Sequence, residues 1–236
     1  MKSPLVSVIV PVHSGERFLA SALESIFQQD YDPYEVIVVD DGSTDRSAEI
    51  VRSYRDIHYL HQSAQGVSVA RNAGVSAARG EFIAFLDQDD IWTPNKLSVQ
   101  MTHFLERPDV GYTIARLRLF LEPGTSTPSW LKEDLLLTDH IGFLPSTLVV
   151  RKATFAQVGD FSSTYKTASD SDWFFRAKDL GIPMSILPDI LLHKRIHSQN
   201  QSSQAQYTSS ELLRVVKASI DRQCRSQISG HNKGTR

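Results

Sequence analysis

The stretch "LVSVIVPVHSGERFLASALESIFQQDYDPYEVIVVDDGS" (residues 5–43) contains three consecutive signals of secondary structure. Residues 5–12 are a continuous apolar, β-branched run, which predicts a buried parallel strand. Apolar side chains then recur at helical spacing within residues 14–29, which predicts an amphipathic helix. Residues 34–43 predict a second buried strand that ends in acids. Strand, helix and strand in this order indicate an α/β domain.

The same alternation continues up to residue 90. The further expected elements are a short helix in residues 43–55, a strand in 57–62, a helix in 66–80 and a strand in 81–90. Ser43 or Thr44 is the expected N-cap of the short helix, and Gly80 is expected to close the longer one. Four strands that alternate with three helices predict an α/β fold with a mostly parallel central sheet flanked by helices.

The second half of the chain is less regular. Its expected elements are a helix in residues 93–107, a strand in 110–121, a strand and short helix in 143–161, a helix in 169–181, a short strand in 182–188 and an amphipathic helix in 209–225. Pro94 lies in the first turn of its helix, where proline is tolerated. Gly159 and Gly181 are expected to end the helices that precede them.

Composition narrows the class of protein. The 236 residues are 41% hydrophobic and 22% charged, as in an ordinary globular protein. A net charge of −2 argues against nucleic acid as a partner. A single cysteine, Cys224, excludes a disulfide framework or a cysteine zinc site within one chain. No run of about 18 apolar residues predicts a membrane helix, and the first residues do not resemble a signal peptide, so we expect a cytoplasmic protein.

Two acidic clusters follow predicted strands. "FIAFLDQDD" (residues 82–90) ends in Asp87, Asp89 and Asp90, and Asp40 and Asp41 end the second strand. Ligands of open α/β sheets bind outside the carboxyl ends of the strands, so both clusters are expected on one rim. Such carboxylates can hold Mg²⁺ or Mn²⁺, which also keep waters and substrate phosphates as ligands. The alternative is that they are solvated loop residues or helix caps, and Asp90 is interpreted as a cap of the helix near Pro94.

These motifs, taken in order, resemble a known family. "VSVIVPVHSGERFLASALESIFQQDYDPYEVIVVDDGSTD" followed by "GVSVARNAGVSAARGEFIAFLDQDDIWTPNKL" is similar to the family 2 glycosyltransferases of the GT-A fold. The similarity extends through "STLVVRKATFAQVGDF", "SDSDWFFRAKDLG" and "RIHSQNQS", roughly residues 4–202. It implies an inverting transfer, dependent on Mn²⁺ or Mg²⁺, from a nucleotide-diphosphate sugar to a hydroxyl group. We expect a UDP-sugar as donor, a glycan or lipid-linked acceptor, and a role in cell-surface glycan or polysaccharide synthesis.

The resemblance also assigns roles to individual positions. It implies that the nucleotide sugar contacts Pro11, Val12, Glu16, Asp40, Arg71 and Asp87. Within this set Asp40 would bind the base. Asp89 and His197 would be the metal-binding positions, and Asp170 the general base. The catalytic domain would span residues 1–205, followed by an amphipathic helix and polar tail in residues 206–236.

The chain departs from the family pattern beside the expected base. Ser169 precedes Asp170 where members often have an acid, so a non-catalytic sugar-nucleotide or glycan-binding module on the same fold is the alternative function. Asp172 is the alternative base, although its expected role is to cap the helix. A dehydrogenase is disfavoured because no G-x-G-x-x-G follows the first strand.

Several polar and aromatic positions keep two interpretations. Arg71, His197 and the basic run 193–195 contact phosphates or face solvent. The tail from Glu211 has six Lys/Arg against two Asp/Glu, so it either contacts the anionic inner face of a membrane or is simply solvated. Among the tryptophans, Trp92 and Trp173 are expected to pack in the core, and Trp130 is expected to contact the acceptor.

Overall fold

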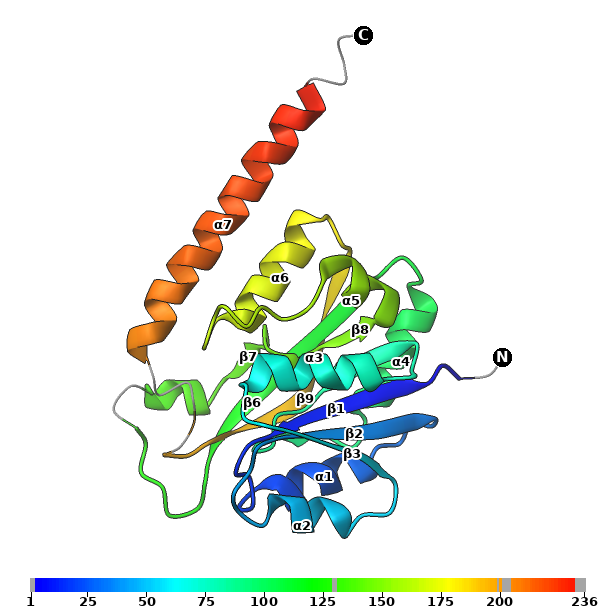
Figure 1. Cartoon of the computed structure of the whole chain (residues 1–236), viewed down its shortest axis with the longest axis vertical. Coiled ribbons are helices and arrows are strands. Elements are labelled where there is room, and N and C mark those ends of the chain that lie inside the picture. The colour runs from blue at the N-terminus through cyan, green and yellow to red at the C-terminus, as the bar shows by residue number, and fades with distance from the viewer. Residues whose placement is uncertain (1–2, 129–130, 199, 201–204, 232–236) are drawn as a thin grey trace.

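The computed structural model describes residues 3–128, 131–198, 200 and 205–231. The sheet has the strand order β3-β2-β1-β4-β8-β6-β9-β5, and β7 pairs with β6 (Figure 1). The elements of the first half are β1 (Val6–Val12), α1 (Leu19–Phe27), β2 (Tyr34–Asp41), α2 (Ser47–Arg52), β3 (Ile57–Gln62), α3 (Val67–Ala77) and β4 (Phe82–Phe85). Those of the second half are β5 (Ile91–Trp92), α4 (Lys96–Glu106), β6 (Tyr112–Leu121), η1 (Glu133–Leu136), β7 (Asp139–Ile141), η2 (Pro145–Thr147), β8 (Val149–Arg151), α5 (Lys152–Val158), α6 (Ser169–Asp179), β9 (Met184–Ile196) and α7 (Ala205–His231).

The first half forms the parallel part of the sheet. β1 pairs in parallel with β2 on one side and with β4 on the other, and β2 pairs in parallel with β3. The chain therefore moves outward from β1 to β3 and then crosses back to the far side of β1. Such a reversal leaves a crevice at the carboxyl ends of the strands, where open α/β sheets bind ligands. The predicted α/β architecture with a mostly parallel sheet is confirmed.

The second half extends the sheet and returns to its centre. β8 pairs antiparallel with β4, and β6 and β9 form a long parallel pair. The prediction of a short strand in residues 182–188 was wrong, because β9 continues to Ile196 alongside β6. β5 pairs antiparallel with β9, with Trp92 opposite Leu192. Since β5 directly follows the acids of residues 87–90, this pairing brings residues 193–197 next to them.

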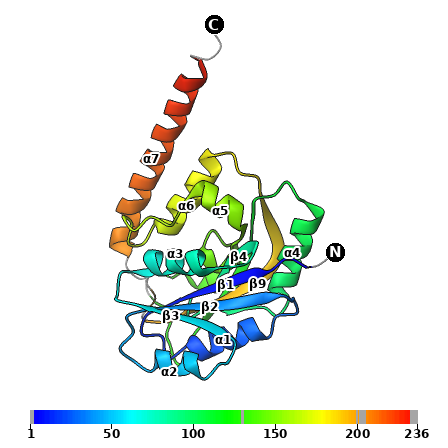
Figure 2. The same cartoon turned by 45° about the vertical axis from the view of Figure 1, so that its right-hand side comes forward.

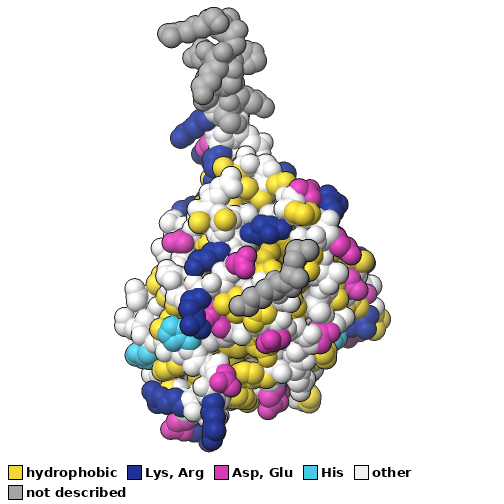
Figure 3. Space-filling model, turned by 90° about the vertical axis from the view of Figure 1, so that its right-hand side faces the viewer, with side chains coloured by type: hydrophobic (Ala, Val, Ile, Leu, Met, Phe, Trp, Pro, Cys, Tyr) yellow, Lys and Arg dark blue, Asp and Glu magenta, His cyan; other side chains and the backbone are white. Residues whose placement is uncertain are grey.

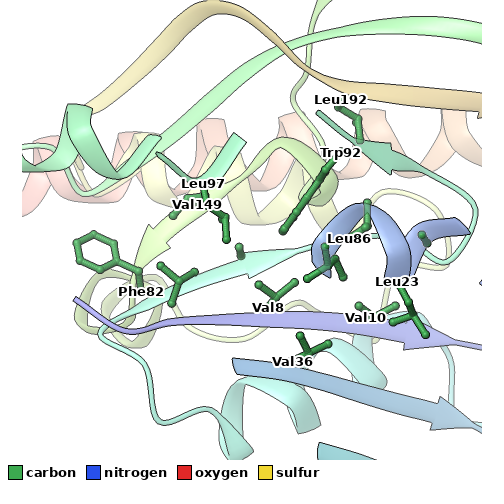
Figure 4. Close-up of a cluster of buried hydrophobic side chains, with 14 of the residues drawn as sticks. Val8, Val10, Leu23, Val36, Phe82, Leu86, Trp92, Leu97, Val149 and Leu192 are labelled. Carbon is green, nitrogen blue, oxygen red and sulfur yellow. The ribbon is translucent and has the colours of Figure 1, made fainter. Parts of the chain in front are cut away.

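Strand alternation divides the core into two layers. Val6, Val8 and Val10 of β1 pack against α1 and α4, whereas Ile9 packs toward α3, α5 and α6. Figure 4 shows part of the first layer, with Val8 and Val10 of β1 on the same side of the sheet as Leu86 and Trp92. Side chains of a strand alternate between faces, so neighbouring residues belong to different layers. Burial of both layers is what holds the helices to the sheet.

The structure confirms that two tryptophans pack in the core, but the predicted N-cap of α2 and the predicted role of Gly80 were wrong. Trp92 and Trp173 are buried, as expected of packing residues. α2 begins at Ser47, and Ser43 accepts a hydrogen bond from the Ser14 amide instead of capping the helix. Gly80 does not close α3, which ends at Ala77. A Cβ at Gly80 would lie 2.7 Å from the Leu5 carbonyl oxygen, so close approach to β1 explains this glycine.

α7 lies beside α6 and then projects away from the body of the molecule (Figures 1 and 2). It is longer than the predicted helix in residues 209–225. In the part of the chain that the structure describes, no helix combines the length and apolar content needed to cross a bilayer. On the face shown in Figure 3, Lys and Arg side chains are interspersed with Asp and Glu.

Candidate active site

A cavity of about 620 Å³ opens at the carboxyl ends of β1, β2 and β4. Its volume is typical of sites for small molecules. α3 and the chain that follows β9 complete its walls. Six of the predicted site residues line it, namely Pro11, Val12, Arg71, Asp87, Asp89 and His197. The sequence prediction therefore brought together positions that are up to 186 residues apart in the chain.

At the β2 end of the cavity, the acid on the wall is Asp41, and Asp40 is not on the wall. The Asp40 carboxylate accepts bonds from the Ser43 amide at 2.8 Å and the Tyr59 hydroxyl at 2.6 Å. Alternation along β2 places Asp40 in the layer of Val38 and Asp41 in that of Val39. The contact of Asp40 with the base stays a prediction.

Asp41 organises the start of α3. Its carboxylate accepts hydrogen bonds from the amides of Gln65 and Gly66 at 2.8 and 2.7 Å. The residue after it, Gly42, has a φ of +72°, and a Cβ there would lie 2.8 Å from the Ala64 amide nitrogen. The Asp-Asp-Gly sequence therefore closes the strand against the helix that forms one wall of the cavity.

Glu16 was predicted beside the base, and in the structure it does not line the cavity, although Gly15 and Arg17 do. Its carboxylate accepts hydrogen bonds from the amide and the guanidinium of Arg46. Both side chains are largely solvent-exposed, and Glu16 does not line the cavity. The residue faces α2 because Glu16 donates its own amide hydrogen to Asp45 at 2.9 Å.

Arg71 and Asp87 form a close ion pair on the cavity wall. Arg71 Nη2 donates to Asp87 Oδ1 at 2.6 Å, and Arg71 is only 6% exposed. The backbone amide of Asp87 donates to Ser146 Oγ at 3.1 Å. Arg71 Nε is buried without a hydrogen-bond partner among the described residues. Arg71 is therefore not a solvated helix residue, and its buried Nε is an unusual unpaired donor among the described residues.

Asp89 lies against the chain that follows β9. Its Oδ2 is 2.9 Å from His197 Nε2 and 3.1 Å from Asn200 Nδ2. Burial of Asp89 opposes its charge, but the contact with His197 and the Lys194 cation hold the pKa of Asp89 below its usual value. Asp89 is thus an ionised carboxylate beside an imidazole at the cavity surface.

Asp90 and Lys194 form an ion pair beneath the cavity surface, next to Asp89. Asp90 is fully buried, and its carboxylate accepts hydrogen bonds from the Arg195 amide at 3.2 Å and Lys194 Nζ at 3.4 Å. The interpretation of Asp90 as a helix cap was wrong, because α4 begins at Lys96 and Asp90 turns inward to β9. Burial opposes the Lys194 charge, but Asp90 and the neighbouring carboxylates raise the pKa of Lys194.

The residues of the basic run 193–195 have different surroundings, and Arg195 fits neither interpretation that the sequence left open. Lys194 lines the cavity. Arg195 points inward, where its Nε donates to the Asp89 carbonyl oxygen at 3.1 Å and Nη1 pairs with Glu122. Lys194 is therefore placed to meet a ligand, and Arg195 supports the backbone that carries Asp89.

The two candidate bases on α6 have different surroundings. Asp170 lies close enough to Arg71 and Asp87 to feel both charges, and burial raises its pKa above the usual value. Asp172 is 4% exposed, and its Oδ2 accepts a hydrogen bond from Arg176 Nε at 2.8 Å. The expectation that Asp172 caps α6 was wrong, because it pairs with Arg176 within the helix and no side chain caps α6 at Ala168. Asp170 does not line the cavity, but it is the carboxyl group near Arg71 and Asp87.

The donor set at the rim fits a hard divalent cation held by few protein ligands. No group of three or more His, Cys, Asp or Glu side chains is arranged for a metal within the described residues. Asp89 and His197 nevertheless offer an ionised oxygen and a nitrogen at one point of the cavity surface. Mg²⁺ and Mn²⁺ need only one or two protein ligands when substrate phosphates and water supply the others.

Sequence reasoning missed three lining or supporting residues. Gln88 bridges two loops, because its Oε1 accepts from the His13 amide at 2.8 Å and its Nε2 donates to the His13 carbonyl oxygen. Asn200 accepts a bond from the His197 amide at 2.6 Å. Lys194 was named only within a basic run. Gln88 lies within the acidic motif of residues 87–90, so the sequence could have indicated it.

Trp130, the expected acceptor contact, lies outside the described residues.

Comparison with known sequences gives a consistent result. The sequence model of Glycosyl transferase family 2 matches residues 7–166. An uncharacterized glycosyltransferase of Rickettsia prowazekii is 31% identical over 218 residues, which cover 86% of this chain and 67% of that protein. TuaG of Bacillus subtilis, named as a teichuronic acid biosynthesis glycosyltransferase, is 33% identical over 141 residues, or 57% of this chain and 55% of TuaG. The chain spans between 35% and 67% of the length of four curated Rickettsia relatives.

Solved structures share the fold. S. aureus TarS 1–349 in complex with UDP has a TM-score of 0.66 and 25% identity, covering 81% of this chain and 60% of that chain. The mannosyltransferase PcManGT from Pyrobaculum calidifontis, in complex with GDP-Man and Mn²⁺, has a TM-score of 0.73 and 19% identity, covering 94% and 65%. The GT-A fold expected from the sequence is confirmed.

Proposed function

Because this chain belongs to glycosyl transferase family 2, we propose that it transfers a sugar from a nucleotide-diphosphate sugar to an acceptor hydroxyl group. One observation carries the proposal. A cavity large enough for a nucleotide sugar contains the carboxylates of Asp87 and Asp89 together with the cations of Arg71 and Lys194. Clustered charges of both signs at such a cavity suit a diphosphate and its cation.

We propose an orientation for the donor in this cavity. Pro11 and Val12 supply an apolar surface for the base at the ends of the strands, next to Asp41. Arg71 and Lys194 supply positive charge toward the diphosphate. UDP bound to TarS and GDP-Man bound to PcManGT support a nucleoside diphosphate as the common element. We propose a UDP-sugar as the first donor to test, and hexosyl transfer as the reaction.

Asp89 and His197 would hold Mn²⁺ or Mg²⁺, which when bound would neutralise the diphosphate as it leaves. The Mn²⁺ in the PcManGT structure supports this assignment. The chain prepares the position by keeping Asp89 ionised and by fixing the loop of His197 through Asn200. Lys194 adds a permanent positive charge on the same wall, which favours the charge that builds on the leaving group.

Asp170 would act as the general base. It would take the proton of the acceptor hydroxyl as that oxygen attacks the anomeric carbon, while the bond to the diphosphate breaks. If Asp170 is the base and no covalent glycosyl-enzyme intermediate forms, the transfer would be one displacement with inversion. The raised pKa of Asp170 suits this task, because a base works best when its pKa lies closer to the operating pH.

The acceptor is assigned only by class. The name of TuaG supports a role in polysaccharide synthesis, with a cell-surface glycan or a lipid-linked sugar as acceptor. A protein that meets such an acceptor would work in the cytoplasm, in part at the inner face of the membrane. We propose residues 1–205 as the catalytic unit and residues 206–236 as the segment that contacts the membrane.

α7 supports the membrane contact with an exposed apolar stripe. Leu213, Val216 and Ile220 are 72%, 39% and 55% exposed, and their spacing places them on one face of the helix. Lys217 lies beside them, as expected for a helix on an anionic surface. We expect Leu213→Glu with Ile220→Glu to reduce pelleting with phosphatidylglycerol vesicles, while phosphatidylcholine vesicles pellet neither protein. Equal pelleting of variant and wild type would end the membrane proposal.

The main experiment is a panel of nucleotide sugars with Mn²⁺, in which released nucleoside diphosphate is measured. We expect one donor to be turned over, and Asp170→Asn to lose most of that turnover while it still binds UDP in calorimetry. A non-catalytic module would bind UDP without releasing it from any donor. A wild-type protein that neither binds UDP or GDP nor turns over any donor would refute the proposed function.

A further inference from the structure

α7 holds the chain that leads into α6. The Glu211 carboxylate accepts hydrogen bonds from the amides of Lys166, Thr167 and Ala168 at 3.0, 2.8 and 3.1 Å. It accepts a fourth from the Thr167 hydroxyl at 3.0 Å. Glu211 is only 8% exposed. One carboxylate thus binds three successive backbone amides from a helix 40 residues further along the chain.

These amides belong to the N-cap of α6 and to the two residues before it. The N-cap is Ala168, which has no polar side chain. Glu211 therefore fixes the backbone that enters the helix, and it places negative charge near the positive end of α6. Burial opposes its ionisation, yet the hydrogen bonds from residues 166–168 hold the pKa of Glu211 below its usual value.

The far end of α6 is also attached to α7. Asp179, the last residue of α6, accepts hydrogen bonds from Ser219 Oγ at 2.8 Å and Arg222 Nε at 2.7 Å. Asp179 lies nine residues after Asp170, or about 13 Å along the helix axis. Glu211 therefore acts at the end of α6 that carries Asp170, and Arg222 at the opposite end.

We propose that Glu211 is a positioning residue for sugar transfer, which holds residues 166–168 so that the carboxylate of Asp170 faces the Arg71–Asp87 side of the cleft. The proposal rests on the proposed function, in which Asp170 is the base. Asp170 follows Ala168 by two residues, so the four bonds to Glu211 fix the backbone immediately before the base. This role of Glu211 would extend the catalytic unit beyond the boundary expected at residue 205, because α7 would belong to it.

The test compares substitutions at two residues of α7, Glu211 and Arg222, which contact opposite ends of α6. Glu211→Ala removes all four bonds, and Glu211→Gln keeps an oxygen acceptor but loses the charge. Arg222→Ala removes one bond at the far end, while Ser219 still holds Asp179. We expect Glu211→Ala to lower kcat by about 10- to 100-fold, with the donor KM within about twofold, because a misplaced base affects only the transfer step. Glu211→Gln should be intermediate, and Arg222→Ala should stay within about threefold of wild type.

Hydrogen exchange measures the clamp directly and needs no substrate. We expect amides 166–170 to exchange faster in Glu211→Ala, while those near Asp179 exchange as in wild type. Unchanged exchange at 166–170, or a kcat of Glu211→Ala equal to that of Arg222→Ala, would overturn the proposal. A rise in donor KM that matches the fall in kcat/KM would also overturn it, since it would indicate general damage to the cavity.

A double-mutant cycle distinguishes the positioning role of Glu211 from the assignment of Asp170 as the general base. If Glu211 acts through the base, Glu211→Ala should cause no further loss in an Asp170→Asn background. An equal further loss in that background would refute the positioning role. If Asp170→Asn alone keeps wild-type turnover, the assignment of the base fails, whatever Glu211→Ala does.

Discussion

The Arg71–Asp87 pair gives the sharpest test of the site, because the sequence alone also allowed Arg71 to be a solvated helix residue. The pair is joined at 2.6 Å, and the side chains of Arg71 and Asp87 are 7% and 25% exposed. Removing one partner of a buried ion pair costs about 3–5 kcal/mol, because the other charge is left buried. Asp87 keeps partial contact with water, so we expect Arg71→Met to cost about 2–3 kcal/mol of unfolding free energy. For a chain of this length that corresponds to a fall in Tm of about 4–12 °C.

The matched control is an ion pair of similar length whose arginine is exposed. Arg79 pairs with Glu35 at 2.8 Å, and their side chains are 79% and 11% exposed. Glu35 would keep the hydrogen bonds from the Ser7 hydroxyl and the Arg79 amide when the guanidinium is removed. Arg79→Met should cost less than about 1 kcal/mol, as exposed pairs do. Urea denaturation of both variants measures the difference.

A cycle with Asp87→Ala completes the argument. In the double variant neither charge remains, so the two costs should not add, and the coupling should exceed about 1 kcal/mol. Costs that add within about 0.5 kcal/mol, or an Arg71→Met variant no less stable than Arg79→Met, would refute the buried-pair interpretation. Arg71→Met should also raise the KM for the donor, because Arg71 lines the cavity.

Three further predictions concern pH, metal and packing. Asp170 must be ionised to act as base, so kcat should fall as the pH drops through its raised pKa, and a kcat that stays flat down to the ordinary aspartate pKa of about 4 would contradict the assignment. The sign for stability is opposite: a carboxyl whose pKa is raised on folding loses stability as the pH rises above its unfolded pKa, so Asp170→Asn should have a higher Tm than wild type at pH 7 and no advantage at pH 3. Asp89→Asn should lose the stimulation of turnover by added Mn²⁺ after treatment with a chelator, while UDP still binds in metal-free buffer; stimulation equal to that of wild type would exclude Asp89 as a ligand. Gly74→Ala should cost about 1–3 kcal/mol in urea denaturation, because its Cβ would lie 2.4 Å from Ile9 Cγ2 across the interface of α3 and β1, and an unchanged midpoint would show that this contact relaxes freely.

The acids that do not line the cavity differ from the expectation for a common reason. Asp40 and Asp41 are adjacent, and which of the two reaches the cavity depends on the phase of strand alternation against α3. Glu16 was assigned by family resemblance and Asp90 by its closeness to the next helix, but each has a partner from another element, Arg46 for Glu16 and β9 for Asp90. A short polar motif indicates that charges are present, whereas the direction of each side chain is decided by what packs beside it.

The amino-acid sequence by itself determined the α/β class, the parallel first half and the rim to which the acids belong. Those features follow from periodicity within single elements and from the shared direction of parallel strands, which are local properties. Only the tertiary structure decided that β9 runs on to bring Lys194 and His197 to Asp89, and that α7 reaches back to Ala168 through Glu211. These contacts join residues more than 40 positions apart through pairing and packing energies that no local pattern records.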